Sequence, residues 1–420
     1  MRYNSTTLLS LMSLSGVLGY NVKPFKVDLS SRMPHLKDLV KLTKLPEASV
    51  LGKAGAGIEL AWLKDRQQEW LEEFDWEKEQ SAMNKFNHST VDIGDMTVHF
   101  IHQRSSSPDA IPLLLTHGWP GSFYEFHEVI GPLSNPGSES NLSFHVIVPS
   151  LPGFGFSSPA PPGWSLNNTA SLFNTLLTEV LGYQTYAAAG GDWGTVLTWG
   201  LHNNHADHVK AVLYTGLIPQ MAPIYESLIS ESQFSDKVDG LSELQRQRLR
   251  NNTVFPTEGF GYFMEHSNRP ATIGLALYDN PIGQLAWISE LYLYRRDPLI
   301  GMAPSTLNNN TILTSVSLYY LTQTFENTVN VYYQNQNGFP FAQRRAVNRV
   351  PMGFADYRYE LTYYPEFYVR EVGNLVYHSE HERGGHFSAL DNPLAYVNDL
   401  RTMMGRWYKP SDDVYFHDEL

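Results

Sequence analysis

The chain has 420 residues, enough for one large catalytic domain with additions or for two domains. Apolar residues make up 42% and charged residues 17%, which is typical of a globular protein that buries its own core. The formal net charge of -13 and the lack of a Lys- and Arg-rich run exclude a basic nucleic-acid surface. Because the chain has no cysteine, thiol catalysis, cysteine-ligated zinc and disulfides are also excluded.

Both ends of the sequence carry patterns typical of targeting signals. Residues 1–20 combine Arg2 with an apolar stretch, Leu8 to Leu18, that is too short to span a bilayer, which predicts a signal peptide cleaved near Tyr20. A disordered or partly buried N-terminus is the alternative interpretation. The last four residues read HDEL, a signal for retrieval to the endoplasmic reticulum, so we expect a lumenal protein without an integral membrane span. Glycosylation sequons begin at Asn4, Asn87, Asn141, Asn167, Asn251 and Asn309.

The apolar pattern divides the chain into an N-terminal extension, an α/β domain and an insertion. Helical spacing over residues 58–86 falls within an extension that we place at 21–105, and the later alternation of strands and helices predicts a parallel sheet. We expect the α/β domain at 106–217 and 350–409, a mostly helical insertion at 218–349 and a tail at 410–420. The expected strands are Met96–His102, Ile111–Thr116, Ser143–Pro149, Tyr183–Gly190, Lys210–Tyr214, Val350–Phe354 and Asn374–Tyr377, and the expected helices include Ala170–Leu181 and Val196–His202.

A glycine-flanked aspartate lies where an expected strand meets an expected helix. Gly190 and Gly194 stand two residues before and two residues after Asp192, which is the nucleophile-elbow pattern with an acid in the nucleophile position. The positive end of the following helix would stabilise the Asp192 carboxylate as an anion. An aspartate that only caps this helix is the alternative interpretation.

Two glycine-rich turns follow other expected strands. The first reads HGWPGS from His117 to Ser122, and the backbone N–H of Trp119 can join that of Trp193, just after Asp192, in an oxyanion hole. The second, PSLPGFGFS from Pro149 to Ser157, indicates by itself only a loop.

A base is expected late in the chain, in the order nucleophile, acid, base. His386 follows two glycines in the segment RGGHF, and this context favours it as the base. His378 and His381 are nearby competitors without the glycines.

The acid that orients this base should lie between Asp192 and His386. We expect it to be Glu360, in the segment YRYELTYYP. Asp356 and Glu366 remain alternatives, and either could be an ordinary surface charge.

Together, HGWPGS, PSLPGFGFS, GGDWGT, RGGHF and the late Glu360 resemble the epoxide hydrolases, specifically the microsomal-type branch and its fungal relatives. The stretch EWLEEFDWEKEQSAMNKFNHS is similar to the N-terminal extension of that branch. The resemblance, from about residue 22 to about residue 408, implies an α/β-hydrolase fold with a mostly parallel central sheet, a helical cap over 218–349 and an N-terminal extension. It implies neither a cofactor nor a metal. Microsomal members commonly start with a membrane-anchoring helix, whereas this chain starts with an expected removable signal.

The resemblance also implies that two cap tyrosines donate hydrogen bonds to the epoxide oxygen. One matches Tyr262 in GYFM and the other matches Tyr333 in VYYQN, with the adjacent Tyr332 as the alternative.

The reaction that the resemblance implies converts a small apolar epoxide into a vicinal diol in two steps. Asp192 opens the ring and becomes an ester, and His386, oriented by Glu360, activates the water that attacks this ester. A biosynthetic epoxide-opening cyclase would use an internal hydroxyl in place of the water, and a haloalkane dehalogenase would have halide-binding groups in place of the tyrosines. A scaffold with a dead hydrolase fold usually lacks the nucleophile or the base, and this chain keeps both.

Overall fold

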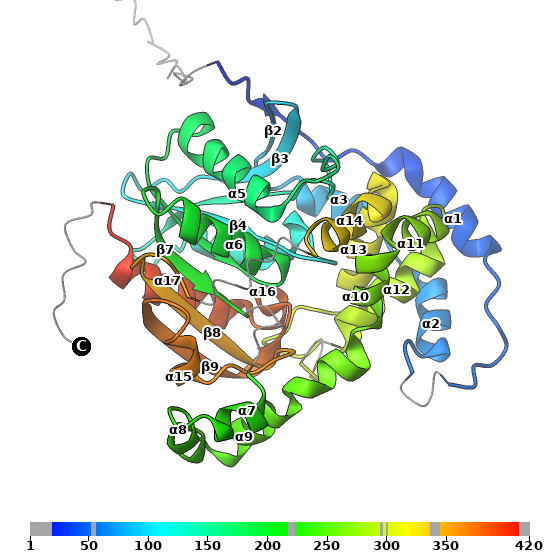
Figure 1. Cartoon of the computed structure of the whole chain (residues 1–420). Coiled ribbons are helices and arrows are strands. Elements are labelled where there is room, and N and C mark those ends of the chain that lie inside the picture. The colour runs from blue at the N-terminus through cyan, green and yellow to red at the C-terminus, as the bar shows by residue number, and fades with distance from the viewer. Residues whose placement is uncertain are drawn as a thin grey trace, which may run out of the picture.

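The computed structural model describes residues 19–51, 56–216, 223–294, 297–299, 301–336 and 345–410. Residues 1–18 of the expected signal peptide and the C-terminal HDEL lie outside the described residues. A central sheet carries helices on its faces, and the N-terminal helices lie beside the cap helices (Figure 1).

Nine strands of the described part of the chain form one sheet in the order β1-β2-β3-β5-β4-β6-β7-β8-β9. Strands β1, β2, β3 and β5 pair antiparallel, and every pair from β5 onward is parallel. The expected mostly parallel sheet is therefore confirmed. The strands are β1 Lys23–Pro24, β2 His88–Ile93, β3 Met96–Gln103, β4 Ile111–Thr116, β5 Phe144–Pro149, β6 Tyr186–Gly190, β7 Val209–Tyr214, β8 Met352–Tyr359 and β9 Leu375–Gly385.

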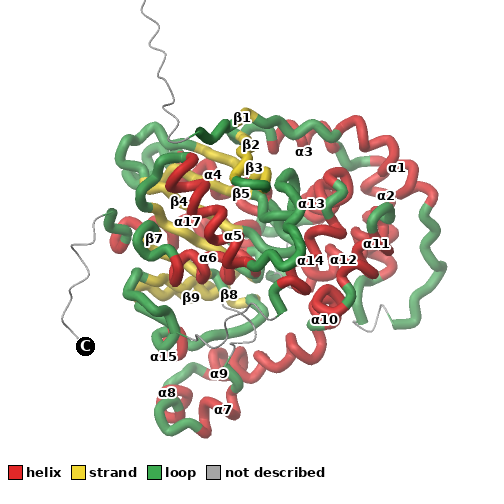
Figure 2. Tube along the Cα trace, turned by 45° about the horizontal axis from the view of Figure 1, so that its top comes forward, coloured by secondary structure: helices red, strands yellow, loops and turns green. Residues whose placement is uncertain are grey.

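The central strands β6 and β7 are buried along their whole length, because helices cover both faces of the sheet (Figure 2). Helix α5 packs on α6, and α4 packs on α17. A continuously apolar strand is what such a two-sided environment requires. The helices associated with the sheet are α4 His127–Ser134, α5 Leu166–Thr175, α6 Trp193–Asn204, α15 Glu366–Val369, α16 Ser388–Asp391 and α17 Pro393–Trp407.

Strands β8 and β9 run further than their apolar segments predict, to Tyr359 and Gly385. Their second halves are polar, and the buried Asp356 in β8 is compensated by an ion pair with Arg248 of the cap. The extra length places Glu360 and His386 directly after the ends of two neighbouring strands.

Between β7 and β8, the described residues form helices and no strand. These cap helices are α7 Tyr225–Ser230, α8 Ser235–Asp239, α9 Glu243–Arg250, α10 Gly261–Asn268, α11 Pro270–Leu277, α12 Pro281–Tyr294, α13 Asn309–Thr322 and α14 Phe325–Gln334.

The helical pattern over residues 58–86 forms two helices, α2 Leu60–Glu72 and α3 Trp76–Met83, preceded by α1 Met33–Leu42. Asp75 separates α2 from α3, because its side chain accepts a hydrogen bond from the N–H of Lys78 at 3.2 Å and caps the second helix. Helices α1 and α2 pack on cap helices α12 and α13, where the Trp70 indole donates to Ser317 Oγ at 2.9 Å. The extension therefore braces the cap as well as the sheet.

A chain of buried histidines joins the extension to the sheet. His88 Nε2 donates to the carbonyl of Met83 at 2.8 Å, so its Nδ1 must accept from His99 Nε2 at 3.0 Å. His99 Nδ1 in turn accepts from the Ser150 hydroxyl at 2.9 Å. Burial lowers the pKa of His88 and lowers that of His99 well below its usual value, so both rings fold in the neutral form.

These histidines predict that the protein loses stability in mild acid. Burial also lowers the pKa of His102 to about 3 and the pKa values of His117 and His202 to about 4. Below pH ~6.5 the unfolded chain gains protons that the folded chain does not, so each such histidine removes about 1.4 kcal/mol of unfolding free energy per pH unit. We expect full stability above about pH 6.5 and a progressive loss toward about pH 4.

Urea unfolding between about pH 7.5 and about pH 5 measures this slope. In the variant His202→Gln, the unfolding free energy should fall less steeply with decreasing pH, by the contribution of one histidine. Unfolding free energies that stay constant over this range would contradict the prediction.

Candidate active site

The turn between β6 and α6 holds Asp192 in a strained backbone conformation, with φ 53° and ψ -128°. A residue with a side chain rarely adopts a positive φ, so this conformation has an energetic cost that the surrounding packing must offset. Gly190 and Gly194 make that packing possible, because a Cβ on Gly194 would overlap the carbonyl oxygen of Thr116 and one on Gly190 would overlap that of Gly194. The two glycines predicted to flank a nucleophile are therefore required by the turn itself.

The turn after β4 lies against the same aspartate. The backbone N–H of Trp119 donates to Asp192 Oδ1 at 2.9 Å, and a Cβ on Gly118 would overlap the Asp192 carboxylate. The hydroxyls of cap residues Tyr319 and Tyr292 donate to the carbonyls of Gly121 at 2.7 Å and of Pro120 at 3.2 Å. The cap thus fixes the turn that carries the Trp119 N–H.

Trp193, the second predicted oxyanion donor, is the first residue of α6. Its N–H belongs to the positive N-terminal end of this helix, directly after Asp192.

Asp192, His386 and Glu360 form a continuous hydrogen-bonded triad. His386 Nε2 lies 3.2 Å from Asp192 Oδ2, and His386 Nδ1 lies 2.8 Å from Glu360 Oε1. The side chains of His386 and Glu360 are 7% and 8% exposed and that of Asp192 is 21% exposed, so Asp192 is the most accessible of the three. The N–H of Leu361 also donates to Glu360 Oε1, at 2.8 Å, which fixes the carboxylate toward the imidazole.

The structure places the two alternative acids away from His386. Asp356 is buried in β8, where its Oδ1 accepts from Arg248 Nη2 at 3.0 Å and burial raises its pKa to about 6. Glu366 pairs with Arg370 at the surface. Among the candidate acids, Glu360 is the one that contacts His386.

The two competing histidines of β9 also have other contacts. The ring of His378 stacks on that of Phe354, with centroids 5.9 Å apart. His381 Nε2 lies 2.7 Å from a carboxylate oxygen of Asp399 in α17. Both contacts hold the edge of the sheet together and leave His386 as the histidine beside Asp192.

The placement of Tyr333 in the site is wrong, and Tyr332 takes its place. Tyr333 is 58% exposed, whereas the ring of Tyr332 is buried edge-on against the ring of Trp193, with centroids 4.8 Å apart. Tyr262 stacks on the Trp119 ring with centroids 5.6 Å apart, and its centroid lies 5.8 Å from that of Tyr332. The predicted Tyr262 and the alternative Tyr332 therefore lie together over the two tryptophans that flank Asp192.

Comparisons with known proteins identify the family to which the chain belongs. The family model described as "Epoxide hydrolase N terminus" matches residues 22–126, and that described as "alpha/beta hydrolase fold" matches residues 111–258. Epoxide hydrolase 1 of Sus scrofa is 30% identical over 405 residues, covering 92% of this chain and 89% of that protein. The chain belongs to the epoxide hydrolase family.

Solved structures of epoxide hydrolases share the same architecture. The structure of the Aspergillus niger epoxide hydrolase superposes with a TM-score of 0.81 at 33% identity, covering 94% of this chain and 98% of that chain. The juvenile hormone epoxide hydrolase of the silkworm Bombyx mori gives a TM-score of 0.82 at 24% identity, over 93% of this chain and 95% of that one, which shows a common fold.

An ion pair with the buried Asp297 of the cap holds the His386 segment of this epoxide hydrolase, and no sequence pattern predicted this contact. Asp297 Oδ2 accepts from Arg383 Nε at 2.5 Å and from the N–H of Gly384 at 3.0 Å. Gly384 has a φ of +99°, which favours glycine. Burial opposes the charge on Asp297, but its hydrogen bonds, above all that from Arg383, lower its pKa overall. This ion pair therefore fixes the turn two residues before His386.

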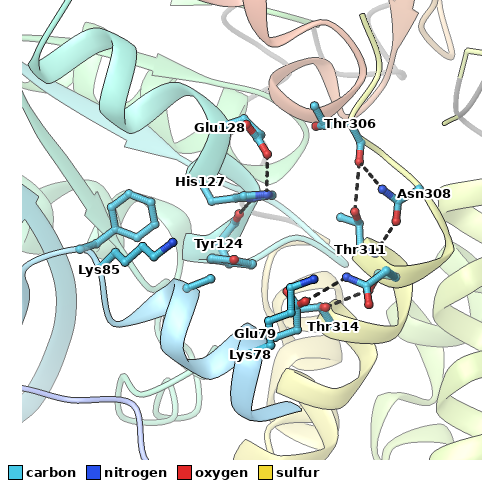
Figure 3. Close-up of a pocket in the computed structure, with 13 residues that line it drawn as sticks. Lys78, Glu79, Lys85, Tyr124, His127, Glu128, Thr306, Asn308, Thr311 and Thr314 are labelled. Atoms are coloured by element: carbon cyan, nitrogen blue, oxygen red, sulfur yellow. Dashed lines mark hydrogen bonds and ion pairs between the residues drawn. The ribbon is translucent and has the colours of Figure 1, made fainter. Parts of the chain in front are cut away.

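A separate cleft of about 560 Å³ lies where the extension, the core and the cap meet (Figure 3). Lys78 and Lys85 of the extension, Tyr124 and His127 of the core, and Thr311 of the cap are among its lining residues. No member of the triad lines it, so it is distinct from the site around Asp192.

Proposed function

We propose that this chain hydrolyses a small apolar epoxide to a vicinal diol through an ester on Asp192. The observation that carries the proposal is the unequal environment of the two carboxylate oxygens. Oδ1 accepts the Trp119 N–H at 2.9 Å, and Oδ2 lies 3.2 Å from His386 Nε2. One oxygen is thus positioned as the future carbonyl oxygen, beside an oxyanion donor, and the other faces the base.

In the first step Asp192 Oδ2 attacks one ring carbon, a C–O bond of the ring breaks, and the ring oxygen becomes an alkoxide. Tyr262 and Tyr332 stabilise this oxygen by hydrogen bonds, and one of them transfers its phenol proton to it. The product is a hydroxyalkyl ester whose carbonyl oxygen, Oδ1, remains at the Trp119 N–H.

In the second step His386 removes a proton from water, and the resulting hydroxide attacks Asp192 Cγ. The N–H groups of Trp119 and Trp193 stabilise the charge on Oδ1, and Glu360 stabilises the imidazolium. When the intermediate collapses, His386 returns its proton to the leaving alkoxide. The new carboxyl group then releases a proton that restores the tyrosine, which completes the conversion of epoxide and water into diol.

Incubation with a panel of styrene, terpene and fatty-acid epoxides, with diol followed by mass spectrometry, tests this proposal. We expect diol from the wild type and a loss of at least about 10⁴-fold for Asp192→Ala, because the covalent route then has no nucleophile. Halide release from haloalkanes without diol would favour a dehalogenase, and a cyclic ether without diol would favour an epoxide-opening cyclase.

We further propose that the protein resides in the lumen of the endoplasmic reticulum. The support is the signal-like stretch 1–20, the HDEL motif and the exposure of sequon residues Asn87, Asn141, Asn167 and Asn251. In the part of the chain that the structure describes, no helix is long and apolar enough to cross a membrane. Digestion with endoglycosidase H should increase the gel mobility of the protein made in its host, and unchanged mobility together with a cytosolic fraction would contradict the proposal.

A further inference from the structure

Glu125 is a partly buried carboxyl that has no part in the mechanism above. It lies in the short 3-10 helix Phe123–Phe126, which follows the HGWPG turn. Its neighbours Tyr124 and His127 line the separate cleft between the extension, the core and the cap, where His127 also pairs with Glu128 at 3.3 Å (Figure 3). Glu125 is not among the residues that line this cleft.

The carboxyl of Glu125 lies instead against the turn that carries the Trp119 N–H. A Cβ on Gly121 would overlap Glu125 Oε2 and would lie 3.3 Å from its Cδ. A Cβ on Gly118, in the same turn, would overlap the Asp192 carboxylate. Gly118 therefore leaves space for the carboxylate of Asp192, and Gly121 leaves space for the carboxyl of Glu125. Trp119, the proposed oxyanion donor, lies between these two glycines in the chain.

The charges of Asp192 and His386 affect the ionisation of Glu125. Burial raises the pKa of Glu125 to about 8, the charge of His386 acts to lower it, and that of Asp192 acts to raise it further. Protonated Glu125 therefore avoids placing a second anion beside Asp192 at neutral pH.

Three buried tyrosines face the same carboxyl from the other elements packed around it. They are Tyr292 of α12, Tyr319 of α13 and Tyr396 of α17. For each of them burial is the main cause that raises the pKa, and the charge of Glu125 adds to it, after that of Tyr292 in the case of Tyr319. These phenols are neutral at any pH at which the enzyme works, so Glu125 is the group of this set that changes charge near neutrality.

We propose that Glu125 is a positioning residue for epoxide hydrolysis, whose uncharged carboxyl supports the Trp119 turn and whose ionisation opposes the hydrolytic step. The inference rests on the proposed roles of Asp192 and His386. An ionised Glu125 destabilises the oxyanion that forms at the Trp119 N–H, because both carry negative charge. It also favours the imidazolium form of His386, and that form cannot act as the base.

The sign of the pH dependence follows from these two effects. Below about pH 8 Glu125 is protonated and does not oppose hydrolysis of the ester; above about pH 8 its carboxylate forms and hydrolysis slows. Ester formation does not use His386 as a base, so it should be less affected.

The test compares Glu125→Gln, which is permanently uncharged, with the wild type and with Glu128→Gln, a matched control on the outer side of the same segment. Single-turnover rates of ester formation and ester hydrolysis are measured from about pH 6 to about pH 10. We expect wild type and Glu128→Gln to lose hydrolysis rate around pH 8, and Glu125→Gln to keep it to at least about one pH unit higher. At pH ~7 its rate should stay within about threefold of the wild type, since the wild-type residue is also uncharged there.

Glu125→Asp is the second variant, in case the amide disturbs folding. It keeps a titrating carboxyl, so the alkaline decline should persist while the rate falls, because the shorter side chain no longer reaches the turn. Superimposable pH profiles for the wild type, Glu125→Gln and Glu128→Gln would overturn the proposal, as would loss of the decline in Glu125→Asp. A wild type that forms neither ester nor diol would instead reject the proposed function itself.

Discussion

Replacing His386 with glutamine is expected to trap the enzyme as an ester on Asp192. The first step needs only the Asp192 carboxylate and the tyrosine hydroxyls, so the variant should still open the epoxide. The second step needs a base, and the base of the proposed site is His386 Nε2, 3.2 Å from Asp192 Oδ2. Loss of a positioned general base costs about 10²–10⁴-fold, and we expect turnover to fall near the upper end of this range. Intact-protein mass spectrometry should show the chain heavier by the mass of one epoxide.

His381→Gln is the matched control for this variant. It also removes a histidine that faces a carboxylate, but the carboxylate is that of Asp399, at 2.7 Å on the edge of the sheet. We expect this variant to unfold at a lower temperature and to hydrolyse the ester at a near-normal rate. Equal ester accumulation in both variants, or in neither, would contradict the role of His386.

Removing the hydroxyl of Tyr262 or Tyr332 should slow the first step, with no ester accumulation. The centroids of their rings lie 5.8 Å apart, and the two rings contact Trp119 and Trp193, whose backbone N–H groups flank Asp192 in the proposed site. Loss of one donor to a developing oxyanion typically costs about 10²–10³-fold, so Tyr262→Phe and Tyr332→Phe should each lose on the order of 10²-fold in the rate of ester formation. Rapid quenching followed by mass spectrometry measures this rate directly.

Tyr333→Phe provides the control, because it makes the same change one residue later in α14. Tyr333 is 58% exposed, so the variant should behave as the wild type. A defect in Tyr333→Phe with a normal Tyr332→Phe would restore the original sequence-based assignment.

Much of the site could be predicted because local sequence determines it. The nucleophile elbow depends on Gly190 and Gly194, which are close to Asp192 in the chain and are forced by backbone contacts. Even the choice of tyrosine had a local signal. Residues Phe325, Thr328, Val329 and Tyr332 are buried at the spacing of one helix face, and that spacing places Tyr332 inward and Tyr333 outward.

Other features depend on contacts between distant segments, and no local pattern reveals them. Asp356, Glu360 and Glu366 all follow the same expected strand, and tertiary contacts distinguish them. Arg248 of the cap pairs with Asp356, whereas His386 contacts Glu360. In the sequence Asp297 has no feature that distinguishes it from a surface acid, because its partner Arg383 is distant in the chain and contacts it only in the folded protein. Glu125 had a weak signal, a carboxyl within the aromatic run Phe123–Phe126, but its place against Gly121 emerges only in three dimensions.

The most direct test of the central claim, a covalent ester on Asp192, is a single turnover in water enriched in ¹⁸O with enzyme in excess over epoxide. In the proposed mechanism the oxygen added to the epoxide comes from Asp192, and water then replaces the oxygen that the carboxylate lost. We therefore predict unlabelled diol after the first turnover and one ¹⁸O atom in the peptide that contains Asp192. Labelled diol with an unlabelled peptide would mean that water attacks the epoxide directly, and would contradict the nucleophilic role of Asp192.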